Sequence, residues 1–395
     1  MTSAAARHLA TLSEVACLVA DGTATRRGAL ADATGLSRAA IAQRVDLLIA
    51  RGLLVETEPT GAAGGRGRPP LILELAPDTL LVCGVDLGAT HCRIALTTLG
   101  GRVVAESARD LDVNDGPDSV LGGVRAGVDA LLAEAGRPSG QLRALGIGVP
   151  GPVEAATGTV VRPPIMAGWD GYRVPGYFEG WYQGPVIVDN DVNVMAFGEY
   201  GQRRISQHLL YVKVGTGIGC GIVSGGVLHR GASGAAGDIG HIRLPGHDEV
   251  PCVCGNTGCV EAVASGAAIA AALRAAGIDA QGASDVARLV AEGNPIARRE
   301  VRLAGRRIGE VLASLVSFHN PDTIVIGGVL GRPGADLLAD VRGAIYRRAL
   351  PLATRNLAIE VSATGERGAV LGAARLAARH LLSPQGIGGL IGKSG

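Results

Sequence analysis

The segment CVCGNTGCVE, residues 252–261, places three thiols within eight positions of the chain. Cys252, Cys254 and Cys259 follow His241 closely, and three thiolates with one imidazole form a common structural zinc set. Four protein ligands fill a tetrahedron and leave no position for water, which predicts a structural zinc ion. The seven cysteines are odd in number and no signal peptide precedes them, which disfavours a disulfide framework. Buried or redox-active cysteines remain the alternative.

A metal-pinned loop would also gather polar side chains into a pocket. Asp238 and His241 precede the cysteines in the segment GDIGH, and Glu261 follows them. Held together, these three side chains could form hydrogen bonds with sugar hydroxyls, with His241 using the ring nitrogen that the metal leaves free. The cysteines would then build a ligand pocket by fixing its loop.

Glycine-rich turns supply candidate phosphate sites. DLGAT (86–90) and GTGIGCG (215–221) each lie between strand-like runs, and such turns present backbone N–H groups to an anion. An aspartate and a threonine in the first turn could add a magnesium and a phosphate contact. A strand ending in two glycines, PDTIVIGGVLG, is a candidate seat for adenine. Each motif alone is equally an ordinary turn. The candidate nucleotide-binding residues are Asp86, Gly88, Thr90, Gly215, Thr216, Gly217, Gly327 and Gly328.

A carboxylate at the end of a strand could provide proton transfer. VIVDNDVNVMAFGEYG (186–201) runs from strand to helix through Asn190 and Asp191. Asp191 beside a sugar hydroxyl could accept its proton as the oxygen attacks a γ-phosphate. Asp and Asn are also favoured as helix N-caps whatever the function, and both interpretations stay open.

The elements that must position these residues follow from the composition. The 395 residues are 47% hydrophobic and 18% charged, which predicts two or three domains with real cores. Gly/Pro-rich residues 58–70 separate a helical segment from alternating strands and helices, an α/β pattern. Segments 82–96 and 210–226 echo each other as strand, glycine turn and strand, which suggests a duplicated lobe. The apolar runs are too short to span a membrane, and we expect a cytoplasmic protein.

The amino-terminal segment has the periodicity of three helices, over residues 5–20, 26–34 and 37–51. Gly35 lies in the short turn before the third helix, and a strand pair with a glycine-rich tip follows it. This is the order of a winged helix-turn-helix, whose second helix enters the major groove. A three-helix dimerisation module is the alternative. The candidate DNA contacts are Ser37, Arg38, Gln43 and Arg44 on the helix, with Arg66 and Arg68 at the wing.

Taken together, these motifs resemble those of the ROK family of repressors, open reading frames and sugar kinases. The matching stretches are VKVGTGIGCGIVSGGVLHRGASGAAGDIGH, CVCGNTGCVE, GIGVPGPV, GWDG and NPDTIVIGG. The resemblance implies a duplicated actin-like/hexokinase-like (ribonuclease H-like) ATPase fold of two lobes. It divides the chain into a DNA-binding domain (1–75), lobe 1 (80–187, completed by a helix at 368–382), lobe 2 with the zinc loop (188–367) and a flexible tail (383–395).

The same resemblance implies roles for the site residues. Asn190 and Asp191 match a sugar-binding Asn and a catalytic base, and Asp238, His241 and Glu261 match sugar contacts. Family kinases usually have Glu at the position of Asp238, and the shorter side chain predicts weakened or altered sugar preference. With its amino-terminal module the chain resembles the family's sugar-responsive repressors. We therefore expect operator DNA, a sugar or sugar-phosphate effector, structural zinc and a homodimer or homotetramer. The alternative is a glucokinase-like sugar kinase that uses ATP and magnesium.

Overall fold

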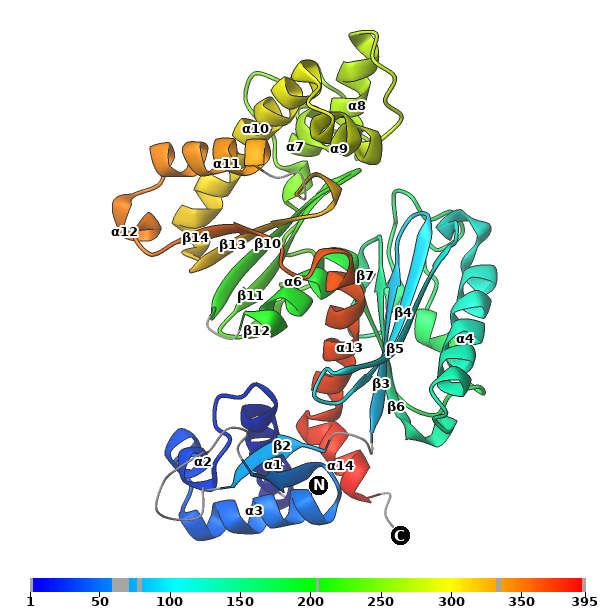
Figure 1. The fold of residues 1–395 in the computed structure, drawn as a ribbon, viewed down its shortest axis with the longest axis vertical. Coiled ribbons are helices and arrows are strands. Elements are labelled where there is room, and N and C mark those ends of the chain that lie inside the picture. The colour runs from blue at the N-terminus through cyan, green and yellow to red at the C-terminus, as the bar shows by residue number, and fades with distance from the viewer. Residues whose placement is uncertain (1–2, 59–70, 77–79, 204–205, 332–334, 393–395) are drawn as a thin grey trace.

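Three parts of the molecule follow one another along the chain in the computed structural model, which describes residues 3–58, 71–76, 80–203, 206–331 and 335–392. Figure 1 shows a small helical module at the bottom and two lobes above it, with one long helix, α13, passing between them. None of the helices in these ranges is long and apolar enough to cross a membrane.

The amino-terminal module consists of three helices and a two-stranded antiparallel sheet. Gly35 ends the second helix at a φ of +68°, a conformation that glycine adopts without strain. Ser37 then caps the third helix, because its hydroxyl accepts a hydrogen bond from the amide of Ala40 at 3.2 Å. The predicted helices agree with the observed ones to within two residues. The elements are α1 (Ser3–Ala20), α2 (Arg27–Thr34), α3 (Arg38–Ala50), β1 (Leu54–Thr57) and β2 (Ile72–Leu75).

Lobe 1 is built on a five-stranded sheet in the order β5-β4-β3-β6-β9. The first three strands in the chain are antiparallel neighbours, and the last two are added in parallel. Helix α4 packs against β4 and β5. The elements are β3 (Leu81–Leu87), β4 (His91–Thr98), β5 (Val103–Asp110), α4 (Pro117–Glu134), β6 (Leu142–Val149), β7 (Val153–Glu154), β8 (Thr159–Val160), α5 (Val174–Phe178) and β9 (Val186–Asn190).

Lobe 2 repeats this plan with a sheet in the order β12-β11-β10-β13-β14. Again an antiparallel group of three is extended by two parallel strands, so the duplicated two-lobe fold expected from the sequence is observed. The elements are α6 (Asp191–Gln202), β10 (His208–Val214), β11 (Ile218–Ser224), β12 (Val227–His229), α7 (Val260–Ala264), α8 (Gly266–Ala275), α9 (Ala283–Ala291), α10 (Pro295–His319), β13 (Thr323–Gly327), α11 (Ala335–Arg348), α12 (Pro351–Thr354) and β14 (Ala358–Val361).

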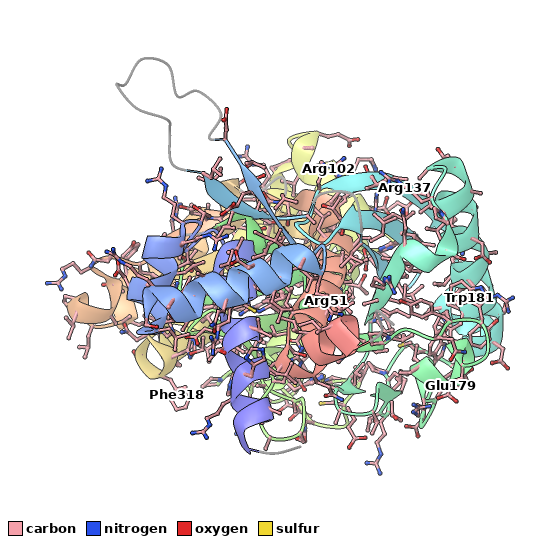
Figure 2. The ribbon with its side chains drawn as sticks, turned by 90° about the horizontal axis from the view of Figure 1, so that it is seen from below. Arg51, Arg102, Arg137, Glu179, Trp181 and Phe318 are labelled. Atoms are coloured by element: carbon pink, nitrogen blue, oxygen red, sulfur yellow. The ribbon has the colours of Figure 1, made fainter. Side chains whose placement is uncertain are left out.

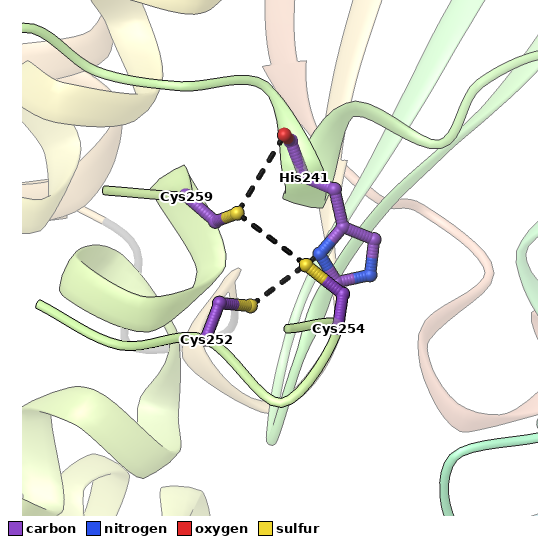
Figure 3. Close-up of side chains that lie close together, drawn as sticks. All are labelled: His241, Cys252, Cys254 and Cys259. Carbon is purple, nitrogen blue, oxygen red and sulfur yellow. Dashed lines mark hydrogen bonds between the residues drawn. The ribbon is translucent and has the colours of Figure 1, made fainter. Parts of the chain in front are cut away.

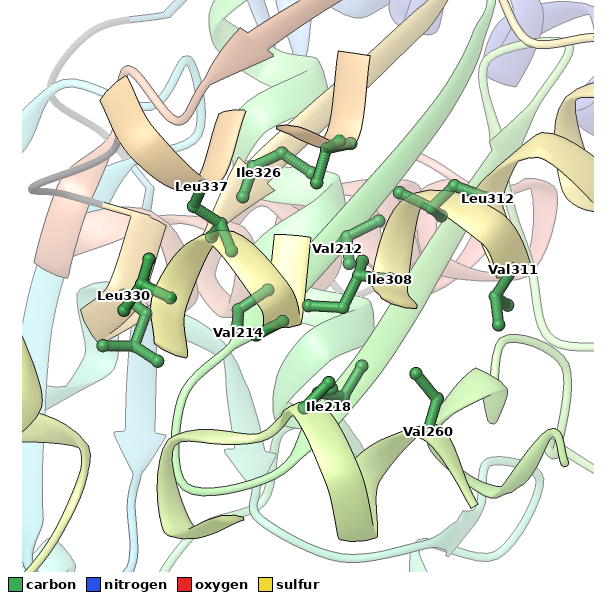
Figure 4. Packing of buried hydrophobic residues seen from close by; sticks show 14 of the residues in the cluster. Val212, Val214, Ile218, Val260, Ile308, Val311, Leu312, Ile326, Leu330 and Leu337 are labelled. Carbon is green, nitrogen blue, oxygen red and sulfur yellow. The ribbon is translucent and has the colours of Figure 1, made fainter. Parts of the chain in front are cut away.

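The core of lobe 2 lies between its sheet and α10. Val212 and Val214 of β10 and Ile326 of β13 meet Ile308 and Leu312 of α10 (Figure 4). Alternate residues of a strand point to one face, and residues four apart on a helix share a stripe, so aliphatic positions at these spacings meet. Leu210, Val212 and Val214 thus face this core, while Leu209 and Tyr211 pack with residues of α6.

Helix α13 (Gly368–Leu381) lies in close backbone contact with both lobes. It packs on β3 and β6 of lobe 1 and on α6 of lobe 2. A Cβ atom on Gly84 would lie 2.1 Å from the carbonyl oxygen of Val370, and one on Gly372 would lie 1.7 Å from that of Val194. Glycine is therefore required at these crossings, since any side chain would force the helix away.

The stretch expected to be a flexible tail, 383–395, instead forms helix α14 over Pro384–Gly392, and residues 393–395 lie outside the described range. Its apolar residues fall at helical spacing, and Ile387 is buried against the amino-terminal module. The glycine-rich composition hid this pattern. Figure 2 shows Arg51, at the end of α3, beside α14, where its guanidinium donates to the carbonyl of Ile391.

Candidate functional site

Four side chains that could hold a metal ion lie close together, as the sequence predicts. The ligand atoms of His241, Cys252, Cys254 and Cys259 all lie within 4.8 Å of one another (Figure 3). The sulfurs of Cys254 and Cys259 are 3.7 Å apart, and the Cys252 sulfur is 3.5 Å from His241 Nδ1. Tetrahedral zinc at ordinary bond lengths separates two sulfurs by about 3.8 Å and sulfur from nitrogen by about 3.6 Å. The donor set and its spacing therefore fit zinc.

The loop that holds these thiols is folded by its own backbone. The amide of Cys252 donates to Asn256 O at 2.8 Å, and Gly255, at a φ of +89°, closes the turn. The amide of Asn256 lowers the pKa of the Cys254 thiol to about 7, whereas burial raises that of Cys259 to about 12. One thiolate is thus available near neutral pH, and a bound cation would favour ionisation of the others.

The second nitrogen of His241 faces the expected sugar pocket. Nε2 lies 4.0 Å from a carboxylate oxygen of Asp238, while Nδ1 points to the cysteines. Glu261 lies in the first turn of α7, and its Oε2 accepts a hydrogen bond from the amide of Ile218 at 2.8 Å. Gly217 leaves the space that this carboxylate fills. The metal loop, the three predicted sugar contacts and the second glycine turn therefore form one site.

Asn190 and Asp191 lie at the junction of β9 and α6. The side-chain Oδ1 of Asn190 caps α6 by accepting a hydrogen bond from Val192 N at 2.9 Å, and its side-chain Nδ2 donates to Gly151 O at 3.0 Å. The side chain of Asn190 thus already serves as a helix cap. The carboxylate of Asp191, whose side chain is 6% exposed, accepts a 2.5 Å hydrogen bond from Lys213 Nζ.

Lys213, at the end of β10, is a site residue that sequence reasoning missed. Burial lowers its pKa, but the neighbouring carboxylates of Asp191, Asp86 and Glu261 outweigh that effect, and its pKa ends above the ordinary value. The ammonium group is therefore charged. A signal existed: the chain has 37 Lys and Arg residues, of which only Lys213 and Lys393 are lysines.

His91 covers the first glycine turn. Its Nε2 lies 3.3 Å from Asp86 Oδ2, and this contact raises the pKa of the imidazole. A Cβ built on Gly88 would fall 2.0 Å from the ring, so the imidazole fills the space beside the glycine. Thr90 is exposed next to it. Sequence reasoning assigned Asp86 to magnesium without noticing this partner.

The remaining predicted nucleotide contacts have structural partners. The amide of Gly215 donates to Gly217 O at 3.0 Å, and Thr216 lies exposed between them. A Cβ on Gly327 would lie 1.9 Å from the Tyr211 hydroxyl, and Gly328 adopts a φ of +82°. Packing inside lobe 2 is thus sufficient to explain Gly327 and Gly328, and the adenine seat stays a prediction.

Helix α3, which follows Ser37 and carries Arg38, Gln43 and Arg44, crosses the front of the view in Figure 2. Ser37, Arg38 and Gln43 are exposed there. Arg44 does not fit the prediction, because its guanidinium turns inward and donates to Thr11 Oγ1 at 2.7 Å and to the carbonyl of Ala40. Arg66 and Arg68 lie outside the described residues.

Comparison with known proteins identifies the family to which the two lobes belong. The ROK family profile matches residues 82–380. The chain belongs to the ROK family. It is 28% identical to the xylose repressor of Caldicellulosiruptor bescii over 380 residues, covering 92% of this chain and 94% of that protein. With the glucokinase of Halalkalibacterium halodurans it shares 30% identity over 305 residues, 73% of this chain and 92% of the other.

A solved structure is similar along nearly the whole chain. The ROK family transcriptional regulator described as a homologue of the E. coli MLC protein superimposes with a TM-score of 0.81 at 25% identity, over 98% of this ROK chain and 99% of the other. The similarity to regulators thus extends through the amino-terminal module, whereas the similarity to the glucokinase covers a smaller part of the chain.

Proposed function

We propose that this ROK protein is a sugar-responsive DNA-binding transcriptional regulator that represses carbohydrate-metabolism genes. One observation carries the proposal: the xylose repressor of C. bescii aligns with 92% of the chain, and the glucokinase of H. halodurans with 73%. The additional length agrees with the amino-terminal module of three helices and a strand pair. A kinase has no evident use for such a module, whereas a repressor requires one.

Helix α3 is the proposed recognition helix. Arg38 and Gln43 are exposed on it, and their side chains suit the edges of guanine and adenine in the major groove. The segment between β1 and β2 would be the wing. Two modules in a homodimer or homotetramer would read a palindromic operator with half-sites about 34–36 Å apart.

The effector pocket is proposed to lie between the lobes at the metal loop. Asp238, His241 and Glu261 would bind hydroxyl groups of a sugar or sugar phosphate, and zinc would be structural, holding His241 in place through its Nδ1. Removal of zinc would therefore loosen the pocket without touching the DNA-binding surface.

The route from pocket to DNA would be α13. This helix packs on the sheet of lobe 1 and on α6 of lobe 2, and its residues Arg375 and Arg379 donate to Asp21, just after α1, at 2.8 Å and 2.7 Å. Sugar that binds the closed cleft more tightly than the open one would shift the population and move the module with α13.

The direct test is fluorescence anisotropy of the chain's own promoter DNA, titrated with protein and then with a panel of sugars. Arg38→Ala and Gln43→Ala should each weaken specific binding by about 1–3 kcal/mol. Arg348→Ala, on the exposed surface of lobe 2, is the matched control and should bind normally. Binding that survives both α3 substitutions unchanged would refute the recognition-helix assignment.

The kinase alternative is tested in the same preparation by release of ADP from ATP in the presence of each sugar. Steady ADP release that is abolished in Asp191→Ala, without promoter binding, would favour the enzyme over the regulator. Sugar-dependent release of DNA without ATP favours the regulator.

A further inference from the structure

Two basic side chains lie against acidic residues of the candidate site. Lys213 Nζ lies 2.5 Å from Asp191, and His91 Nε2 lies 3.3 Å from Asp86. These two carboxylates are the ones that phosphate transfer would use, one as base and one as magnesium contact. Each carboxylate already has a positive or protonatable partner, which a strand of its own lobe contributes.

Magnesium and a nucleotide fit this arrangement poorly. Magnesium binds through carboxylate oxygens, retains several waters and demands near-octahedral geometry. Here an ammonium group lies against Asp191 within the electrostatic reach of Asp86 and Glu261, so a divalent cation would meet repulsion. The imidazole of His91 also fills the space beside Gly88, where a phosphate would approach the turn.

We infer that Lys213 is a built-in counter-ion that takes the place of magnesium and nucleotide, so that sugar alone closes the cleft. Asp191, Asp86 and Glu261 would repel one another as the lobes approach, and the Lys213 ammonium offsets that repulsion. Asp191 then accepts a hydrogen bond from a sugar hydroxyl and does not take its proton. The inference rests on the proposed function and adds that the response needs neither magnesium nor nucleotide.

The test compares wild type with Lys213→Met, which removes the charge at similar length, and Lys213→Arg, which keeps it. Sugar affinity is measured by thermal shift and by isothermal titration calorimetry under three conditions: without magnesium, with millimolar magnesium, and with magnesium plus a non-hydrolysable ATP analogue. Wild type and Lys213→Arg should bind sugar equally under all three conditions. Lys213→Met should lose about tenfold in sugar affinity without magnesium and recover part of it when magnesium is added.

Several controls keep the outcome clear. Promoter binding without sugar, together with zinc content, shows that Lys213→Met is folded, and its promoter affinity should equal that of wild type. A merely structural lysine would lower stability without creating a magnesium dependence. The inference is overturned if wild type needs magnesium and nucleotide for its sugar response, or if Lys213→Met binds sugar as wild type does without magnesium.

The inference and the proposed function fail separately. If wild type fails to bind promoter DNA, the proposed regulator function is refuted, while the sugar-binding measurements still test the role of Lys213 as a counter-ion. Conversely, promoter binding released only by sugar with magnesium and nucleotide refutes the counter-ion and leaves the regulator standing.

Discussion

Replacing Asp21 by alanine should separate sugar binding from the response of the DNA-binding module. Asp21 accepts hydrogen bonds from Arg375 at 2.8 Å and Arg379 at 2.7 Å, and its side chain is 22% exposed. A hydrogen bond to a charged group contributes about 1.5–3 kcal/mol when buried. Partial exposure of both arginines reduces this, and we expect about 2 kcal/mol for the pair of contacts together.

That energy is comparable to a typical allosteric coupling of 1–3 kcal/mol in other proteins. Losing about 2 kcal/mol would reduce a sugar effect of about 30-fold on promoter affinity to almost none. The assay is promoter affinity by anisotropy with and without saturating sugar, with sugar affinity measured separately by titration. In Asp21→Ala, both affinities should be retained and their coupling lost.

A matched control comes from the same module. Asp46 is 65% exposed and pairs with Arg27 at 2.7 Å, entirely within the module. Asp46→Ala should therefore leave the sugar effect unchanged. If Asp21→Ala released DNA with the same sugar dependence as wild type, the ion pairs between α1 and α13 would not transmit the signal, and the coupling route would be wrong.

Three further substitutions test the candidate metal loop, the buried carboxylate of Glu199 and the pH dependence of stability. If the proposed zinc is present in wild type, Cys259→Ser should lose it, measured by mass spectrometry of the protein's metal content, and should lose sugar affinity while keeping promoter binding. Equal zinc content in wild type and Cys259→Ser would argue against the ligand set. Glu199, fully buried, has its pKa lowered because bonds from Ala363 N and Arg203 outweigh burial, so its contribution is present above its ordinary pKa of 4.5 and lost as pH falls through the lowered value. Glu199→Gln should cost about 3 kcal/mol in the free energy of unfolding by urea at pH 7, and unchanged stability would contradict the buried pair. Burial lowers the pKa of His319 below 6.5, so its contribution to stability is complete above pH 6.5 and is lost as pH falls toward the lowered value. His319→Phe should therefore reduce the loss of thermal stability between about pH 7.5 and 5.5. The same pH dependence in wild type and variant would exclude His319 as its source.

The sequence predicted the elements whose signals are local. Helix periodicity, the Ser37 cap and the turn at Gly35 located the amino-terminal helices, because each depends on residues within a few positions of one another. The grouping of His241 with three cysteines was equally predictable, since the thiols are close in sequence and the imidazole precedes them by few residues.

Long-range partners were not predictable in this way. Nothing near Asp191 in sequence indicates that Lys213 reaches it from another strand, and Gly88 does not reveal that an imidazole lies over it. Arg44 was assigned to DNA by helical phase alone, but whether an arginine turns outward depends on the acceptors of α1 nearby. Helix α14 was missed because its seat on α1 lies far away in the sequence.

The placement of α13 and α14 has a consequence for biosynthesis. The amino-terminal module shares its apolar core with Ala377, Leu381 and Ile387, which the ribosome adds long after α1 to α3 have emerged. The hydroxyl of Ser13 also donates a hydrogen bond to the carbonyl oxygen of Leu382 at 2.6 Å. Domains tend to fold as they emerge during synthesis, yet here part of the apolar core of the first module is supplied by α13 and α14. Helices α1 to α3 would therefore reach their full packing only once residues 368–392 have been made.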